Sequence, residues 1–197
     1  MEYLITQYKL EEGALEIQYI EEFFGEFPRR KMADEIIARL DGREHLILMA
    51  LARLPDGSRQ HVPVAFKVAH EILADESEPK LRDLVSRLHG SVTFAGRRIL
   101  YSWIGGTRRD WRGQGHFGAL SEQQEVWALQ NNFDEMVVKT KNKFYDMRGA
   151  LDSLRYQVIK YERNAFDNAE SKVYLSKKLA PDMLREHKSL RTVVEAA

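Results

Sequence analysis

The chain has 197 residues, and its thirty Lys and Arg side chains balance thirty Asp and Glu side chains, so its net charge is zero. A neutral chain without a basic run gives no support for nucleic-acid binding, and a hydrophobic content of 44% is typical of a globular protein. The lack of cysteine excludes disulfides, thiolate nucleophiles and cysteine-ligated zinc, and it fits a reducing cytosol. No signal peptide is evident and no apolar run could cross a bilayer, so we expect a cytoplasmic protein without a membrane partner.

The first part of the chain predicts helices followed by a hairpin. Apolar residues recur at helical spacing across residues 17–40, and Pro28 divides this region into two helices. Two apolar segments, 45–52 and 62–72, predict buried strands. A turn signal at 55–58 (Pro-Asp-Gly-Ser) lies between them, so we expect the two strands to form a β-hairpin.

Residues 73–98 are predicted to be a helical insertion. Leucine and valine recur at helical spacing over 81–88, and Gly90 is placed to end that helix. The acidic stretch before it, 74–79, predicts a solvated loop, with a lid over a pocket as the alternative.

The second half of the chain alternates strands and helices. We predict strands at 99–104, 136–140, 156–161 and 172–176, helices at 113–131 and 144–154, and a last helix in the tail from about residue 181. This order predicts an α/β fold in which helices flank a sheet, and the length suits one domain over residues 1–197.

The most informative stretch is the basic, glycine-rich turn between the predicted strand at 99–104 and the helix after it. The first N–H groups of a helix lack partners and its dipole favours negative charge, while glycines let a phosphate approach the backbone. The turn therefore predicts a site for a phosphate-bearing ligand, with an ordinary surface turn as the alternative. The spacing of Gly113, Gly115 and Gly118 excludes the dinucleotide pattern, and no Gly-Lys-Ser/Thr follows.

Several segments together resemble the GNAT acyltransferases, which use acyl-coenzyme A. Residues 112–117 (Arg-Gly-Gln-Gly-His-Phe) match the family's pyrophosphate loop, and 140–144 with Met147 match its strand end followed by an Asn at a helix start. Residues 101–107 are similar to the strand that leads into the loop in one branch of the family. The similarity covers roughly residues 17–179, and several local signals agree with one topology.

The resemblance implies a fold and a reaction. The fold would be a single domain with a mixed, mostly antiparallel sheet that splays at the acyl-CoA site and leaves a slot for the thioester beside residues 138–140. Acetyl-CoA would be the co-substrate, and an acetyl group would pass directly to a primary amine of a small molecule or a protein. Family members are often dimers, so a homodimer stays open.

The resemblance also implies roles for individual residues. The pyrophosphate would be held by backbone N–H groups of Arg112, Gly113, Gln114, Gly115, His116, Phe117 and Gly118. The pantetheine arm would pair with the strand end at Gly105, Gly106 and Thr107. Asn142 would bind the pantetheine or help to fix the splay, and its alternative role is that of an ordinary helix cap. The side chain of His116 would lie over the coenzyme or, more simply, face solvent in the loop.

The sequence departs from the family pattern at three places, and the last two keep a second function open. Phe117 stands where Gly or Ala is usual, and Arg155-Tyr156 stand where many members have Gly-Phe. Many members also place a Tyr near the coenzyme sulfur as general acid, and the corresponding residue here is Leu151. The alternative is therefore an acyl-CoA sensor or degenerate module that does not catalyse transfer.

Glu71, at the end of a predicted strand, is our candidate for the general base that deprotonates the amine. A solvent-exposed carboxylate without a catalytic role is the alternative, and His70 is a second candidate on the opposite face of the strand. The six histidines are scattered without metal-ligand spacing, so no metal is expected. The acceptor amine is not identified by any pattern.

Overall fold

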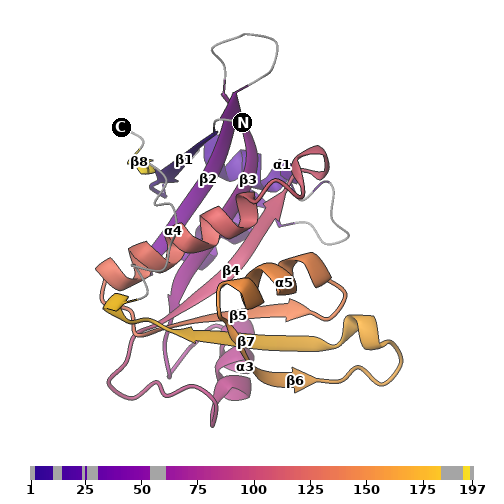
Figure 1. Ribbon diagram of the computed structural model, residues 1–197. Helices are drawn as coiled ribbons and strands as arrows, with labels where there is room; N and C mark the ends of the chain where they lie inside the picture. Colours follow the sequence, from indigo (N-terminus) through magenta and orange to yellow (C-terminus); the bar gives the residue numbers. More distant parts are fainter. Residues whose placement is uncertain are drawn as a thin grey trace. The chain divides into compact units, whose positions relative to one another are not determined.

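The computed structural model describes residues 3–10, 15–23, 25, 31–53, 61–182 and 193–195. The chain forms two compact units (Figure 1), the first made of Met1–His70, Ile104–Gln124 and Ser189–Ala197, and the second of Glu71–Trp103 and Glu125–Lys188. Three elements contribute residues to both units: β3 (His61–Ile72), β4 (Ile99–Thr107) and α4 (His116–Gln130).

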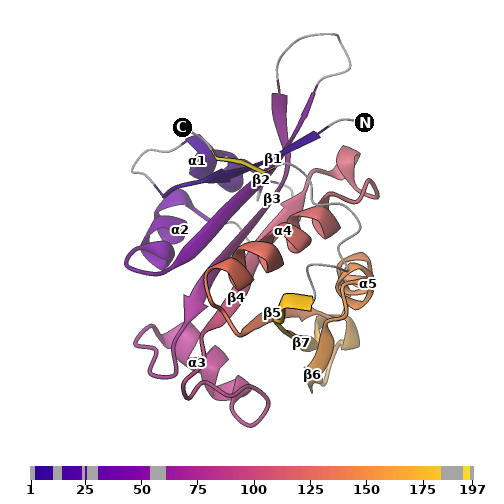
Figure 2. The same ribbon diagram turned by 60° about the vertical axis from the view of Figure 1, so that its left-hand side comes forward.

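The first unit holds a mostly antiparallel set of strands with two short helices. Its further elements are β1 (Tyr3–Tyr8), α1 (Leu15–Phe23), α2 (Ala33–Leu40), β2 (His45–Arg53) and β8 (Val193–Glu195). Strand β2 pairs antiparallel with both β1 and β3, and β8 runs parallel to β1 (Figures 1 and 2). Buried Ile36 and Leu40 lie four residues apart on α2, which is the spacing of an amphipathic helix.

Most predictions for the first unit are confirmed, and one strand was missed. The β2–β3 hairpin is present, whereas its predicted turn at 55–58 and the break at Pro28 lie outside the described residues. Strand β1 was not predicted, although its sequence (Tyr-Leu-Ile-Thr-Gln-Tyr) has the β-branched and aromatic content of a strand. The predicted last helix falls largely on residues 183–192, which are also outside the description, and residues 193–195 form a strand.

The second unit holds a mixed set of strands. Its further elements are α3 (Pro79–Leu88), β5 (Glu135–Lys141), α5 (Tyr145–Ser153), β6 (Gln157–Glu162) and β7 (Lys172–Lys178). Strand β7 pairs antiparallel with β5 and β6, while β4 pairs parallel to β5 over Ile99–Ser102 and Glu135–Val138. The predicted α/β fold with a mixed, mostly antiparallel sheet is therefore confirmed. One domain over residues 1–197 stays a prediction.

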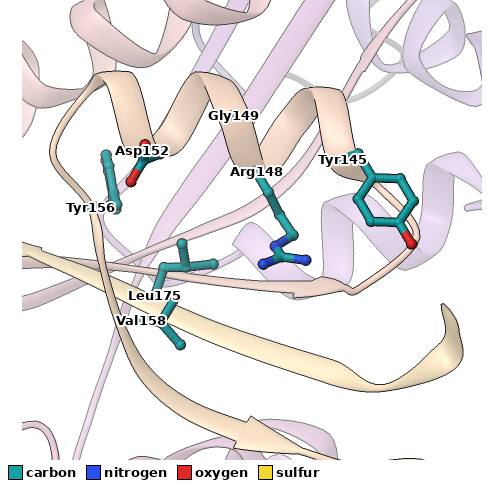
Figure 3. A pocket seen from close by; sticks show the side chains of 7 residues that line it. All are labelled: Tyr145, Arg148, Gly149, Asp152, Tyr156, Val158 and Leu175. Carbon is teal, nitrogen blue, oxygen red and sulfur yellow. The ribbon is translucent and has the colours of Figure 1, made fainter. Parts of the chain in front are cut away.

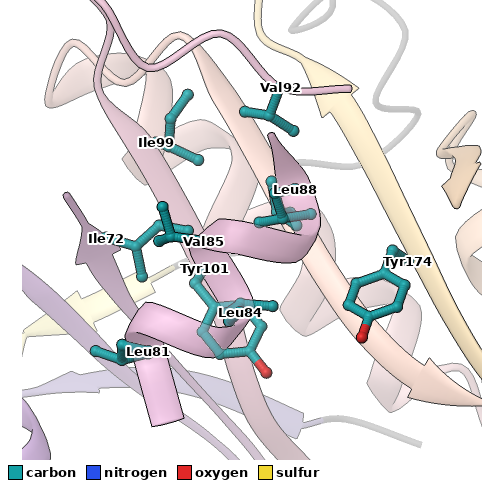
Figure 4. Close-up of a cluster of buried hydrophobic side chains, with 10 residues drawn as sticks. Ile72, Leu81, Leu84, Val85, Leu88, Val92, Ile99, Tyr101 and Tyr174 are labelled. Atoms are coloured by element: carbon teal, nitrogen blue, oxygen red, sulfur yellow. The ribbon is translucent and has the colours of Figure 1, made fainter. Parts of the chain in front are cut away.

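The insertion predicted at 73–98 contains α3, which builds the core of the second unit. Pro79 stands at the first turn, and the Glu78 carboxylate accepts hydrogen bonds from the backbone N–H groups of Lys80 and Leu81. The buried face of the helix packs on side chains from the neighbouring strands (Figure 4): Leu81, Leu84, Val85 and Leu88 against Ile72, Ile99, Tyr101 and Tyr174. Val137 belongs to the same buried cluster. The acidic stretch is not simply solvated, because Glu76 is buried and accepts a hydrogen bond from the Leu73 N–H at 2.9 Å.

Candidate functional site

The glycine-rich turn lies in the first unit, between the end of β4 and the start of α4. Gly113 and Gly115 have φ angles of +76° and +82°, which side-chain-bearing residues rarely adopt. Because these angles are not helical, α4 begins at His116 rather than at the predicted Gly113. The N–H of Ala119 donates to the Gly115 carbonyl at 3.0 Å, so the N–H groups of residues 116–118 have no acceptor within the helix.

The strand before the turn is longer than predicted and includes Gly105, Gly106 and Thr107. A Cβ added to Gly105 would lie 3.0 Å from Lys67 Cγ and 3.1 Å from the Phe66 carbonyl oxygen. Gly105 therefore has a packing role against β3 besides its predicted role in binding pantetheine.

Lys67 is a positioning residue that the sequence analysis missed. Its side chain is buried, and its Nζ donates to Ser121 Oγ at 2.8 Å and lies 4.6 Å from the centre of the Phe117 ring. Ser121 Oγ in turn donates to the Phe117 carbonyl at 2.8 Å. These contacts tie the first turns of α4 to β3, and they give the unusual Phe117 a cation–π partner. A single lysine in a strand carries no sequence signal for burial.

The prediction that His116 faces solvent is wrong. Its side chain is only 3% exposed and packs edge-on against the ring of Tyr3, with the ring centres 4.6 Å apart. The ring of Trp111 lies 6.0 Å away, and neither ring nitrogen has a hydrogen-bond partner among the described residues. Burial lowers the pKa of His116 because the imidazolium loses its hydration.

We expect His116 to make the fold sensitive to acid. Since its folded-state pKa lies below the ordinary value of 6.5, its contribution to stability is present above pH 6.5 and is lost as the pH falls toward the lowered pKa. The free energy of unfolding of the wild type should therefore decrease over this range by up to about 1.4 kcal/mol per pH unit more than that of His116→Phe. Urea unfolding between pH 7 and 5 measures this, with His61→Phe at an exposed position of β3 as control. Equal slopes for wild type and His116→Phe would contradict the expectation.

Asn142 lies in the second unit and does not cap α5. The helix begins at Tyr145, after Phe144, and no side chain caps it, so the helix-cap alternative is wrong. Instead the Asn142 amide donates to the Asn168 carbonyl at 3.2 Å and accepts a hydrogen bond from Arg148. The first bond joins the segment after β5 to the segment before β7, and the second joins it to α5. Its role toward pantetheine stays a prediction.

Glu71 also lies in the second unit, where it is paired with arginine. Its side chain is 19% exposed, and its two oxygens accept hydrogen bonds from Arg98 Nε and NH2 at 2.9 and 3.1 Å. Arg98 Nη1 also donates a hydrogen bond to the Asn131 carbonyl at 2.7 Å, and Arg98 Cζ lies 4.3 Å from the centre of the Phe133 ring. The carboxylate is thus part of a fixed network, and its role as a base stays a prediction. The second candidate, His70, is fully buried.

Helix α5 places no tyrosine at the position of the family's general acid. Leu151 is buried there, whereas Tyr145 is exposed. Tyr145 lines a cavity of about 430 Å³ together with Arg148, Gly149, Asp152, Tyr156, Val158 and Leu175. Figure 3 shows Arg148 and Asp152 pointing from α5 toward the strands. Tyr156 is buried, so an aromatic core residue stands where the family usually has Phe. Burial, together with the negative charge of Glu125, raises the pKa of Tyr156 well above its ordinary value.

The described residues hold neither a cluster of metal-ligating side chains nor a membrane-spanning helix. No three His, Asp or Glu side chains of this part of the chain gather as metal ligands would. None of its helices is both long enough and apolar enough to span a membrane.

Comparison with known proteins identifies the fold. No protein-family model and no curated protein matches the sequence. Among solved structures, that of Arabidopsis thaliana NAA60 in complex with acetyl-CoA is 15% identical, with a TM-score of 0.65, and the match covers 90% of this chain and 98% of that one. The ribosomal-protein-S18-alanine N-acetyltransferase from Escherichia coli is 14% identical, with a TM-score of 0.59 and coverage of 90% and 95%. A protein from Desulfovibrio desulfuricans assigned to the GNAT acetyltransferase family is 10% identical, with a TM-score of 0.60 and coverage of 91% and 100%. This chain therefore has the fold of the GNAT N-acetyltransferases.

Proposed function

We propose that this protein is an N-acetyltransferase that moves an acetyl group from acetyl-CoA to a primary amine. The observation that carries the proposal is the turn before α4, where two glycines with positive φ lead into a helix N-terminus with N–H groups that have no acceptor within the helix. Its support is the similarity in fold to NAA60, whose structure holds acetyl-CoA, and to an enzyme named for acetylating a ribosomal protein.

In the proposed reaction, the amine nitrogen attacks the thioester carbonyl carbon and the carbon–sulfur bond breaks. The amine loses a proton and the coenzyme leaves as its thiol, so that the products are an amide and free coenzyme A. A backbone N–H near Thr107 would stabilise the carbonyl oxygen as charge develops on it. Because the chain has no cysteine, no cysteine acyl-enzyme forms and the transfer is direct.

Several further properties belong to this proposal. The acetyl acceptor is a small-molecule or protein amine, and the protein acts in the cytoplasm as one domain without metal, nucleic acid or membrane. The pyrophosphate of the coenzyme lies against residues 112–118, and the pantetheine arm pairs with Gly105–Thr107 and reaches Asn142.

The test is release of coenzyme A thiol from acetyl-CoA in the presence of a panel of amines. Thiol release that depends on an added amine, with the acetylated amine found by mass spectrometry, supports the enzyme. Acetyl-CoA binding without amine-dependent release favours the alternative, a sensor that does not catalyse transfer. Failure to bind acetyl-CoA would contradict both.

Glu71→Gln tests the base. If Glu71 deprotonates the amine, this variant should lower kcat for amine-dependent thiol release by about 10²-fold or more, because general-base catalysis contributes about that much. Arg98→Met is the matched variant, since it breaks the same ion pair but keeps the carboxylate. A kcat that falls equally in both variants, together with equal losses in thermal stability, would show that Glu71 serves only the ion pair.

A further inference from the structure

One face of the second unit carries more positive than negative charge. Val137 on β5 and Tyr174 on β7 belong to the same buried cluster as the leucines of α3. Because side chains alternate along a strand, every second residue on either side of Val137 and Tyr174 also faces α3. Around Glu162 on that face, four cations and two carboxylates form ion pairs or interact electrostatically, and we call them the α3-face cluster: Arg87, Lys139, Lys160, Lys172, Asp83 and Glu162. Four positive charges against two negative ones leave a surplus of two.

Both carboxylates of the α3-face cluster are already engaged. Glu162 accepts two hydrogen bonds from Arg87 NH1, both at 2.8 Å, and one from the Tyr174 hydroxyl at 3.2 Å. Its oxygens also lie 3.5 Å from Lys172 Nζ and 3.7 Å from Lys160 Nζ. Asp83 binds Arg87 Nε at 2.8 Å. The surplus positive charge is therefore not balanced within the cluster.

Lys139 is the cation of the cluster that forms no ion pair with Asp83 or Glu162. Within the described part of the chain its Nζ has no carboxylate within 4.0 Å, and its closest recorded contact is the Tyr174 ring, whose centre is 5.8 Å away. The pKa of Lys139 is lowered, first by burial and then by repulsion from Lys172 and Arg87, while Asp83 and Glu162 oppose this in part. A half-buried ammonium in a positive field is unfavourable unless an anion approaches it.

The position of Lys139 in β5 connects the cluster to the proposed reaction. The parallel pairing of β5 with β4 ends at Val138, and Lys139 is the next residue. The resemblance to the GNAT acyltransferases implies that the thioester lies beside residues 138–140. A group bound at Lys139 would therefore be close to the reacting amine.

We propose that the α3-face cluster binds a negatively charged group of the acetyl acceptor, so that the acceptor is an amine that carries a carboxylate or phosphate group near its amino group. This inference rests on the proposed function and names its substrate class. Lys139 is the specificity-determining residue, and the ion pairs of Arg87 and Glu162 hold the cluster in place.

Acetyl transfer to matched peptides tests the proposal. The acceptors are hexapeptides with a free amino terminus that differ only at their second residue, which is Asp, phosphoserine, Asn or Lys. For the wild type, KM should be at least about 10-fold lower with Asp than with Asn, because a charge-assisted hydrogen bond is worth about that factor. The phosphoserine arm distinguishes a carboxylate site from a phosphate site, since the preferred group should give the lower KM.

Substitution of Lys139 should remove this preference. Lys139→Met should raise KM for the acidic peptides about 10-fold relative to KM for the Asn peptide, whereas Lys139→Arg should keep most of the preference. Lys178→Met, at the exposed end of β7, is the matched control and should behave as the wild type. A wild type that prefers neither acidic peptide over the Asn peptide, or a Lys139→Met variant that keeps the wild-type preference, would overturn the proposal.

Peptide binding without coenzyme separates this proposal from the proposed function. If no peptide gives thiol release, fluorescence anisotropy of the same labelled peptides measures the anion site directly. Tighter binding of the acidic peptides, lost in Lys139→Met, would support the anion site and place the failure in the transfer reaction. Equal binding of acidic and neutral peptides would overturn the inference whatever the activity.

Discussion

Gly115→Glu should reduce the affinity for acetyl-CoA by about 100-fold or more. The substitution places a carboxylate in the turn before α4, where the N–H groups of the first helical turn would hold the coenzyme pyrophosphate. Like charges brought together at a binding site cost several kcal/mol, and each 1.4 kcal/mol is a factor of ten in affinity. Isothermal titration of wild type and variant with acetyl-CoA measures the difference.

Strain in the backbone has to be separated from this charge effect. Gly115 has a φ of +82°, so any side chain there strains the turn. Gly90 has a φ of +85°, and an added Cβ meets nothing within 4 Å at either position. Gly90→Glu therefore carries the same substitution and similar strain in the turn after α3, and it should bind acetyl-CoA as the wild type does. If Gly115→Glu binds acetyl-CoA as tightly as the wild type, the assignment of the turn to the pyrophosphate is contradicted.

Lys177→Met should lower the free energy of unfolding by about 3–5 kcal/mol, because it leaves a buried carboxylate without its cation. Glu125 on α4 is 0% exposed, and Lys177 on β7 is 11% exposed, with their charged atoms 2.7 Å apart. Both residues lie in the second unit, where the Lys177 ammonium is also 5.7 Å from the centre of the Tyr156 ring. Urea denaturation at neutral pH measures the change.

The double variant Glu125→Leu, Lys177→Met is the control for this prediction. With both charges removed, no buried charge is left unpaired, and replacement of such pairs by apolar residues is often neutral or stabilising. We therefore expect the double variant to recover most of the stability that Lys177→Met loses. If it is as unstable as the single variant, the loss comes from packing rather than from the unpaired carboxylate.

Features encoded by nearby residues could be predicted from the sequence. The helix predicted at 81–88 followed from leucine and valine spacing within a few residues, and in the structure it begins two residues earlier, at Pro79. The glycine turn could also be predicted locally, because the positive φ angles of Gly113 and Gly115 are ones that other residue types rarely adopt. The hairpins and the mixed sheet followed from strand periodicity and element order.

The environment of the candidate site residues could not be predicted in the same way. Glu71 has the sequence of an exposed strand end, and only the fold brings Arg98, twenty-seven residues away, to its carboxylate. His116 stands in a polar loop, yet the ring of Tyr3, more than a hundred residues earlier, buries it. Lys67 likewise has no local signal for its burial beneath the start of α4.

The sequence by itself determined the order of most elements, the glycine turn and the helix that follows it, and hence the likeness to the GNAT acyltransferases. The tertiary structure alone decided which side chains are buried and which charges are paired. It also decided which cations, such as Lys139, have no carboxylate partner among the described residues. The physical reason is that helix periodicity and backbone dihedral angles depend on neighbours along the chain. Burial and electrostatic environment depend instead on which distant segments of the chain come into contact. The sum of many small interaction energies determines which segments do so.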